Sequence, residues 1–98
     1  MTYGIIVRPE AEQDLREAAQ WYEEKLEGLG REFLVCIDAA LSLIKRNPKL
    51  YPQIYKNVRR MLIRRFPFGI FYIVEEAQIA VLAIFHASRA PKKWQERI

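Results

Sequence analysis

The sequence contains few of the residues from which proteins build cross-links, metal centres and phosphate loops. Its 98 residues include one cysteine, one histidine and four glycines. The single cysteine, Cys36, excludes an internal disulfide and a cysteine-based metal cluster, and it favours a reducing compartment. One histidine and scattered carboxylates give no metal-ligand spacing, and the glycines form no phosphate-binding loop. We therefore expect no metal and no cofactor.

Long apolar runs are also missing. No segment approaches the ~20 apolar residues of a membrane-spanning helix, and the apolar run in residues 3–7 is too short for a signal peptide. A cytoplasmic protein is expected. Hydrophobic residues make up 51% of the chain, which is enough for a core, and no repeat, low-complexity tract or linker interrupts it. Residues 1–98 are therefore expected to form a single domain.

Positive charge is concentrated in the second half of the chain. Residues 1–47 carry nine acids and six bases, a net charge of −3, whereas residues 48–98 carry ten bases and three acids, a net charge of +7. Charge divided in this way indicates that the second half meets an anionic partner, such as nucleic acid or an acidic peptide.

The first half predicts a strand and two helices. A short β-rich run at residues 3–7 is followed by apolar residues at helical spacing from about residue 9 to 26, and again from about 31 to 47. Glu10, Glu12 and Asp14 place negative charge in the first turn of the first helix, where it complements the helix dipole. A glycine-containing reversal at residues 27–30 favours an antiparallel helical hairpin.

The second half predicts a loop followed by strands. Residues 48–57 hold two prolines and two tyrosines and indicate an ordered loop. Three β-rich runs at residues 58–66, 70–74 and 78–85 have short connections, which predict a three-stranded antiparallel meander. A short turn of helix is expected after Pro91. The order β-α-α-β-β-β is an α+β fold, with the helical hairpin packed on one face of a mainly antiparallel sheet.

Two of these runs differ in character. The last is almost wholly apolar, as a central strand covered on both faces would be. In the run 58–66, alternation places arginines among apolar residues on both faces, which indicates an edge-like strand or one that lines a basic groove. The faces are Arg60, Leu62 and Arg64 on one side, and Arg59, Met61, Ile63 and Arg65 on the other.

Two interpretations of the arginine pairs Arg59-Arg60 and Arg64-Arg65 are open. Guanidinium groups on rigid strands can hold phosphates or carboxylates in a forked geometry. Alternatively, these charges keep an edge strand soluble and prevent edge-to-edge pairing.

The segment around the only histidine is a second candidate site. His86 follows the last predicted strand and is either a general acid or base or a strand-end residue that bonds a carbonyl. Arg89, Lys92 and Lys93 add cationic reach, and Trp94 either stacks on a base or packs on the core. Metal-independent RNA cleavage would need a further proton-handling group, for which Tyr72 is the evident choice. Cys36 falls among apolar positions of the second predicted helix, so a buried structural thiol is expected.

A set of short motifs extends over the whole chain. They are Pro9-Glu10-Ala11-Glu12, Asp14-Leu15, Trp21-Tyr22-Glu23, Gly28-Leu29-Gly30, Phe33, Asn47-Pro48, Tyr51-Pro52, Arg59-Arg60, Phe66-Pro67, Ile70-Phe71-Tyr72, His86, Ser88-Arg89, Pro91 and Trp94. In order and spacing they resemble the RelE/ParE superfamily of type II toxins, often labelled plasmid stabilisation proteins. The resemblance implies a compact toxin fold and a cognate antitoxin with an acidic, partly disordered tail, which the basic half of the chain suits.

The two main branches of that superfamily imply different targets. RelE-like members cut mRNA on the ribosome, whereas ParE-like members inhibit DNA gyrase. The tyrosine that closes the nuclease cluster after the last strand is missing here, and so is a terminal His-Tyr pair. The hairpin with Trp21-Tyr22-Glu23 looks more like ParE.

The leading hypothesis is a growth-inhibiting toxin that binds gyrase without chemistry of its own and is neutralised by an antitoxin in a hetero-oligomer. Its expected target- or antitoxin-binding residues are Arg59, Arg60, Arg64, Arg65, Arg89, Lys92, Lys93 and Trp94. The alternative is a ribosome-dependent mRNA endonuclease in which His86 and Tyr72 handle protons. In that case Arg59, Arg64 and Arg89 would stabilise the phosphorane. A third possibility is a degenerate toxin that acts only as a binding module.

Overall fold

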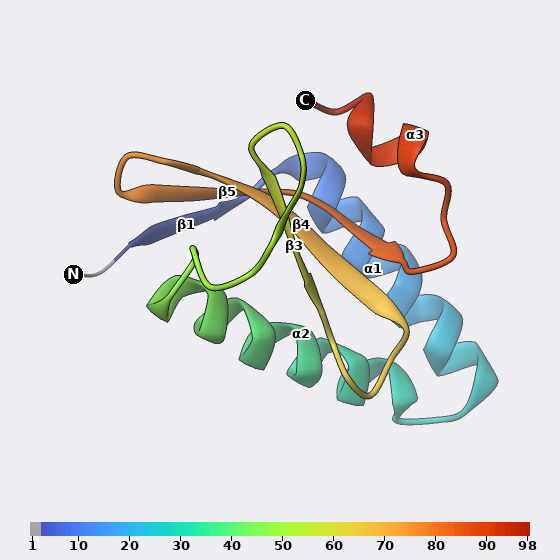
Figure 1. Ribbon diagram of the computed structural model, residues 1–98. Coiled ribbons are helices and arrows are strands. Elements are labelled where there is room, and N and C mark those ends of the chain that lie inside the picture. The colour runs from blue at the N-terminus through green and yellow to red at the C-terminus, as the bar shows by residue number, and fades with distance from the viewer. Residues whose placement is uncertain (1–2) are drawn as a thin grey trace.

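The computed structural model describes residues 3–98, so residues 1 and 2 of the expected domain lie outside it. Its elements follow one another as β1 (Gly4–Val7), α1 (Pro9–Lys25), α2 (Leu29–Arg46), β2 (Gln53–Tyr55), β3 (Val58–Leu62), β4 (Phe68–Glu75), β5 (Gln78–His86) and α3 (Pro91–Gln95) (Figure 1). The expected α+β fold is confirmed. No helix within residues 3–98 has both the length and the apolar character needed to cross a membrane.

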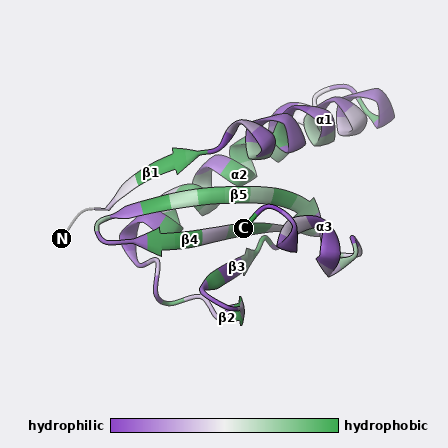
Figure 2. Cartoon of the chain, turned by 90° about the horizontal axis from the view of Figure 1, so that it is seen from above, coloured by the Kyte–Doolittle hydropathy of each residue, from purple (hydrophilic) through white to green (hydrophobic). Residues whose placement is uncertain are grey.

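The five strands described in residues 3–98 belong to one sheet in the order β1-β5-β4-β3-β2, and Figure 2 shows them one below another in that order. The meander β3-β4-β5 is antiparallel, as predicted, and β1 pairs with β5 in parallel. Parallel neighbours need a long crossover connection, and here the rest of the chain provides it. The first and last strands in the sequence are therefore side by side, with β1 at one edge of the sheet.

The helical hairpin is tightly closed at its turn. Gly28 has a φ of 88°, a left-handed conformation that favours glycine. The Glu23 carboxylate accepts hydrogen bonds from the backbone N–H groups of Gly28 (2.8 Å) and Gly30 (3.0 Å), and so caps the start of α2. The sequence analysis placed Gly30 in the reversal, whereas in the structure it lies inside α2. A Cβ on Gly30 would lie 2.5 Å from the carbonyl oxygen of Ala19, so this glycine lets the two helices approach.

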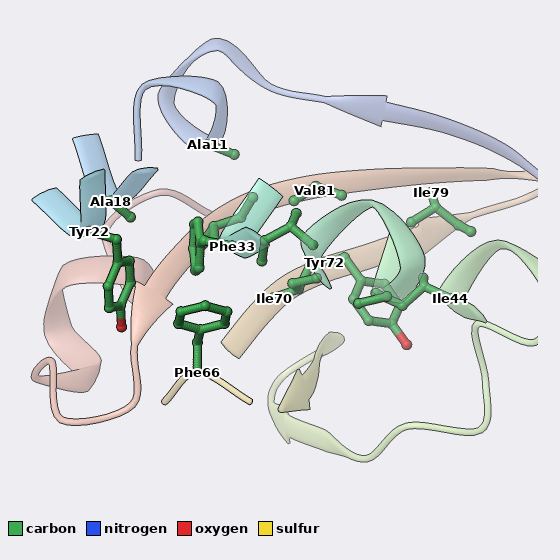
Figure 3. Packing of buried hydrophobic residues seen from close by; sticks show 13 residues of the cluster. Ala11, Ala18, Tyr22, Phe33, Ile44, Phe66, Ile70, Tyr72, Ile79 and Val81 are labelled. Carbon is green, nitrogen blue, oxygen red and sulfur yellow. The ribbon is translucent and has the colours of Figure 1, made fainter. Parts of the chain in front are cut away.

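Both helices cover the same face of the sheet (Figure 3). At one end of this core the rings of Tyr22, Phe33 and Phe66 meet with centroids 4.8 to 5.2 Å apart. The two contacts of Phe66 are edge-to-face, a geometry that adds to the burial energy. The remaining core residues on this face include Ala11, Ala18, Ile37, Ile44, Ile70, Tyr72, Ile79, Val81 and Ile84.

The opposite face of the sheet has a smaller core of its own, over which α3 folds. The indole of Trp94 stacks on Phe71 with a centroid distance of 4.9 Å and an interplanar angle of 26°. A register shift in the β4–β5 pairing leaves Leu82 as the extra residue of a bulge, so Leu82 and Ala83 both reach this face. Central strand β5 is therefore covered on both faces, as predicted, and Figure 2 shows hydrophobic residues along most of its length.

Several expected boundaries were wrong. The loop expected at residues 48–57 contains the short strand β2, so β2 forms the edge and β3 lies inside the sheet. The strand expected at 58–66 ends at Leu62 because Phe66 turns into the aromatic core. The Phe68 N–H donates to the Phe66 C=O across this bend, and β4 begins at Phe68 instead of Ile70. The last strand extends one residue further than expected, to His86.

Candidate functional site

The two arginines of β3 occupy opposite faces of the sheet. Arg59 donates from Nη1 to the backbone carbonyls of Tyr51 (2.6 Å) and Lys49 (3.1 Å), which fixes the loop after α2 to the strand. Arg60 packs its stem over Gly69, and its Nε is buried without a hydrogen-bond partner among residues 3–98. Arg59 is therefore a structural residue, and Arg60 is only half-exposed.

The second arginine pair does not lie on a strand, contrary to expectation. Arg64 and Arg65 are in the bend between β3 and β4, and both are exposed. Arg65 Nη2 is 2.7 Å from Glu32 Oε1, an exposed ion pair that connects the bend to α2. Arg64 has no ion-pair or side-chain hydrogen-bond partner within residues 3–98. Of the four arginines in this segment, only Arg64 is both exposed and without an ion pair or side-chain hydrogen bond to the described residues.

Tyr72 is fully buried on the helix-covered face. Its hydroxyl donates a 2.6 Å hydrogen bond to the carbonyl of Pro48. Burial raises the pKa of Tyr72 to about 12, against a smaller lowering by the Arg59 guanidinium. In Figure 3 the Tyr72 ring lies beside Ile44, in the interior of the protein. The phenol is therefore protonated near neutral pH and has no route to a substrate.

His86 is exposed at the end of β5. Its Nδ1 accepts the backbone N–H of Ser88 (3.1 Å) and lies 2.7 Å from Ser88 Oγ, so the neutral ring carries its proton on Nε2. One of the two interpretations of His86 was a strand-end residue that bonds a backbone carbonyl. In the structure the His86 ring instead accepts a backbone N–H. His86 pairs with Phe68 in the ladder, and Tyr72 lies four residues further along β4, which is a separation of roughly 13 Å. The structure does not bring His86 and Tyr72 together.

A cleft of about 580 Å³ lies between α1 and the ends of β4 and β5. Its lining residues are Asp14, Glu17, Ala18, Trp21 and Tyr22 from α1, together with Pro67, Phe68, Ile84, Phe85, His86, Ser88 and Arg89. The Arg89 guanidinium lies 4.4 Å from the Phe85 ring centroid, a cation–π contact that holds it at the rim. Of the predicted residues, only His86 and Arg89 share this cleft. Lys92 and Lys93 are exposed on α3, whereas Trp94 is buried.

The structure also contains an ion pair that the sequence analysis missed. Arg97 donates two hydrogen bonds to the Asp14 carboxylate, at 2.6 and 3.1 Å. Asp14 also accepts the backbone N–H of Ile84, and Arg97 donates to the carbonyl of Leu82. β1 ends at Val7, so these two side chains take the place of a neighbouring strand along this part of β5. One feature of the sequence could have indicated the ion pair: Asp14 falls at helical spacing between the apolar residues Ala11 and Ala18, on the face that α1 buries.

Comparison with known proteins gives a consistent family. The sequence model of the family described as ParE toxin of type II toxin–antitoxin system, parDE, matches residues 5–91. The search of curated proteins found no match.

Three solved structures have a similar fold at low sequence identity. The chromosomal ParDE system from P. aeruginosa is 18% identical, with a TM-score of 0.65 over 87% of this chain and 96% of that one. A variant of the E. coli toxin RelE in the free state is 16% identical, with a TM-score of 0.68 over 99% of this chain and 94% of that one. The RelBE2 toxin–antitoxin complex from Mycobacterium tuberculosis is 16% identical, with a TM-score of 0.61 over 88% of this chain and 99% of that one.

Proposed function

Because this chain belongs to the ParE family of type II toxins, we propose that it inhibits bacterial growth by binding DNA gyrase, without chemistry of its own. We further propose that a cognate antitoxin neutralises it in the cytoplasm by direct binding. The gyrase target rests on the ParE branch of the superfamily, and the antitoxin on the toxin–antitoxin systems to which that family belongs.

The burial of Tyr72 is the observation that favours a binding mechanism over RNA cleavage. Cleavage without a metal needs an acid and a base that both reach the reacting phosphate. Tyr72 is buried with its hydroxyl bonded to Pro48, whereas His86 is exposed at the far end of β5. Arg59, a third member of the nuclease set, bonds two backbone carbonyls. These contacts favour a protein that acts through its surface.

The predicted site cations that are exposed and unpaired support an acidic partner. In residues 3–98, the exposed residues Arg64, Arg89, Lys92 and Lys93 form no ion pair with a carboxylate. Unpaired surface charge of one sign steers an oppositely charged segment and contributes to specificity. We therefore assign antitoxin or target contacts to these four residues, and structural roles to Arg59, Arg65 and Trp94.

A gyrase supercoiling assay tests the proposed target. Purified chain is expected to block supercoiling and to leave cleaved DNA complexes, and added antitoxin is expected to restore activity. The His86→Ala variant should retain full toxicity, because the histidine handles no proton in a binding mechanism. Unaffected supercoiling, together with codon-linked mRNA cuts in primer extension that depend on His86, would establish the endonuclease instead.

A further inference from the structure

The cleft between α1 and β5 contains a short stretch of unpaired strand edge. In the ladder with β4, Ala87 N–H donates to Pro67 C=O, and Phe85 pairs with Gly69 in the same alternation. The backbone groups of Ile84 and His86 therefore point away from β4, toward the side where β1 has already ended. Asp14 accepts the Ile84 N–H, but no group in residues 3–98 bonds the Ile84 C=O or the His86 N–H.

This donor and acceptor have the spacing that a parallel strand requires. One residue of an extended segment can donate its N–H to the Ile84 C=O and accept the His86 N–H with its own C=O. Both residues line the cleft; Ile84 is buried, at 1% exposure, and His86 is exposed. An unpaired strand edge selects a peptide over a small molecule, because only a backbone repeats this pattern of groups.

The walls of the cleft specify the side chains of that peptide. Trp21, 54% exposed, forms an aromatic wall with Tyr22 and Phe68, which suits a bulky apolar side chain. On the strand side, the Arg89 guanidinium is held over Phe85 and pairs with no carboxylate in residues 3–98, which suits an acid. Glu17 lies on the α1 wall, so the cleft is acidic on one side and cationic on the other.

We propose that this cleft binds a short extended segment of the antitoxin, parallel to β1. The segment places an apolar side chain against Trp21 and a carboxylate on Arg89, and it pairs with the free edge at Ile84 and His86. This assignment rests on the proposed neutralisation by an antitoxin, and it specifies where and how that partner binds.

Amide hydrogen exchange tests the backbone pairing directly. The ¹⁵N-labelled chain is compared alone and in complex with the protein encoded beside its gene. Exchange at the His86 N–H is expected to slow about 10-fold or more in the complex, because the amide becomes hydrogen-bonded. The exposed amide of Glu76, in the turn between β4 and β5, serves as the control and should not change. An unchanged rate at His86 in a formed complex would overturn the strand pairing.

Matched variants test the side-chain contacts. Arg89→Glu and Trp21→Ala are each expected to weaken binding of that protein about 10-fold or more, as measured by calorimetry. Lys49→Glu and Leu50→Ala make comparable changes, a charge reversal and the loss of a large apolar side chain, at exposed positions in the loop after α2, and they should leave affinity within about 2-fold. Thermal melts of all four variants confirm that each is folded.

The two proposals fail in different ways. If the unaltered chain binds and is neutralised but the cleft variants bind equally well, the cleft assignment is wrong and neutralisation stands. If the unaltered chain does not bind the adjacent-encoded protein at all, both are wrong.

Discussion

Replacing Asp14 with alanine is expected to destabilise the whole fold, because this carboxylate connects three distant parts of the chain. It accepts two hydrogen bonds from Arg97 near the C-terminus and one from the backbone N–H of Ile84 in β5. The Asp14 side chain is 7% exposed and that of Arg97 is 23% exposed. Removing the carboxylate leaves a largely buried guanidinium without its counter-charge and a buried N–H without an acceptor.

The size of this loss follows from the burial of the pair. Breaking one partner of a buried ion pair costs about 3–5 kcal/mol, and partial exposure of Arg97 places this case at roughly 3 kcal/mol. A chain of this length has a stability of about 5–15 kcal/mol, so a large part of it would be lost. The corresponding fall in Tm is roughly 12–24 °C. Asp14→Asn keeps an acceptor for Ile84 N–H and should lose about 1 kcal/mol less.

Urea unfolding of a double-mutant cycle measures the interaction. Asp14→Ala, Arg97→Ala and the double variant are expected to give a coupling energy of about 1–3 kcal/mol. Glu12→Ala is the control, because the Glu12–Arg16 pair is exposed at 3.6 Å, and its loss should cost less than about 0.5 kcal/mol. A coupling energy near zero, or a loss for Asp14→Ala no larger than that of the control, would refute the reasoning.

Three further changes test other parts of the fold. Gly30→Ala should cost about 2 kcal/mol in urea unfolding, because the new Cβ meets the Ala19 carbonyl and forces the helices apart; an unchanged midpoint would contradict this contact. Tyr72 has a folded pKa of about 12 against an ordinary value of 10.0, so the unfolded chain loses its proton first and stability falls as pH rises from 10 to 12. Tyr72→Phe should remove this loss of stability between pH 10 and 12. It should also cost about 1 kcal/mol at neutral pH, because the hydrogen bond to Pro48 is lost. Thermal melts across this pH range measure both effects, and an unchanged pH dependence would contradict the first. Trp94→Ala should cost about 3 kcal/mol and expose the face around Phe71; a hydrophobic dye that binds no better than to the unaltered chain would argue against it.

Much of the fold could be predicted from short-range patterns. The apolar spacing in residues 9–26 and 31–47 identified both helices, because one helical face must be buried whatever lies opposite it. The apolar run around Val81 indicated a strand covered on both faces, and the short connections indicated a meander. The predicted ends of the strands were wrong where a residue leaves its strand to pack in the core. Phe66 turns into the aromatic cluster, which ends β3 early and moves Arg64 and Arg65 off the sheet.

The candidate site was predicted less well, because charge in a sequence does not reveal which groups are already paired. Arg59 and Arg64 both belong to arginine pairs in the sequence, yet Arg59 bonds two carbonyls, whereas Arg64 has no partner among residues 3–98. His86 and Arg89 both line the cleft, since they are only three positions apart in the sequence. The other wall of their cleft comes from α1, and no pattern near His86 indicates that.

The sequence by itself determined the family, the order of helices and strands, and the surplus of positive charge in the second half. All of these depend on local spacing or on residue identity. Only the tertiary structure decided that Asp14 would meet Arg97, 83 residues away, and that Tyr72 would be buried with its hydroxyl on Pro48. It also decided that β1 would end at Val7 and leave a free edge beside Trp21 and Arg89. These features arise where distant segments compete for the same backbone groups, and that competition is resolved only when the chain is packed.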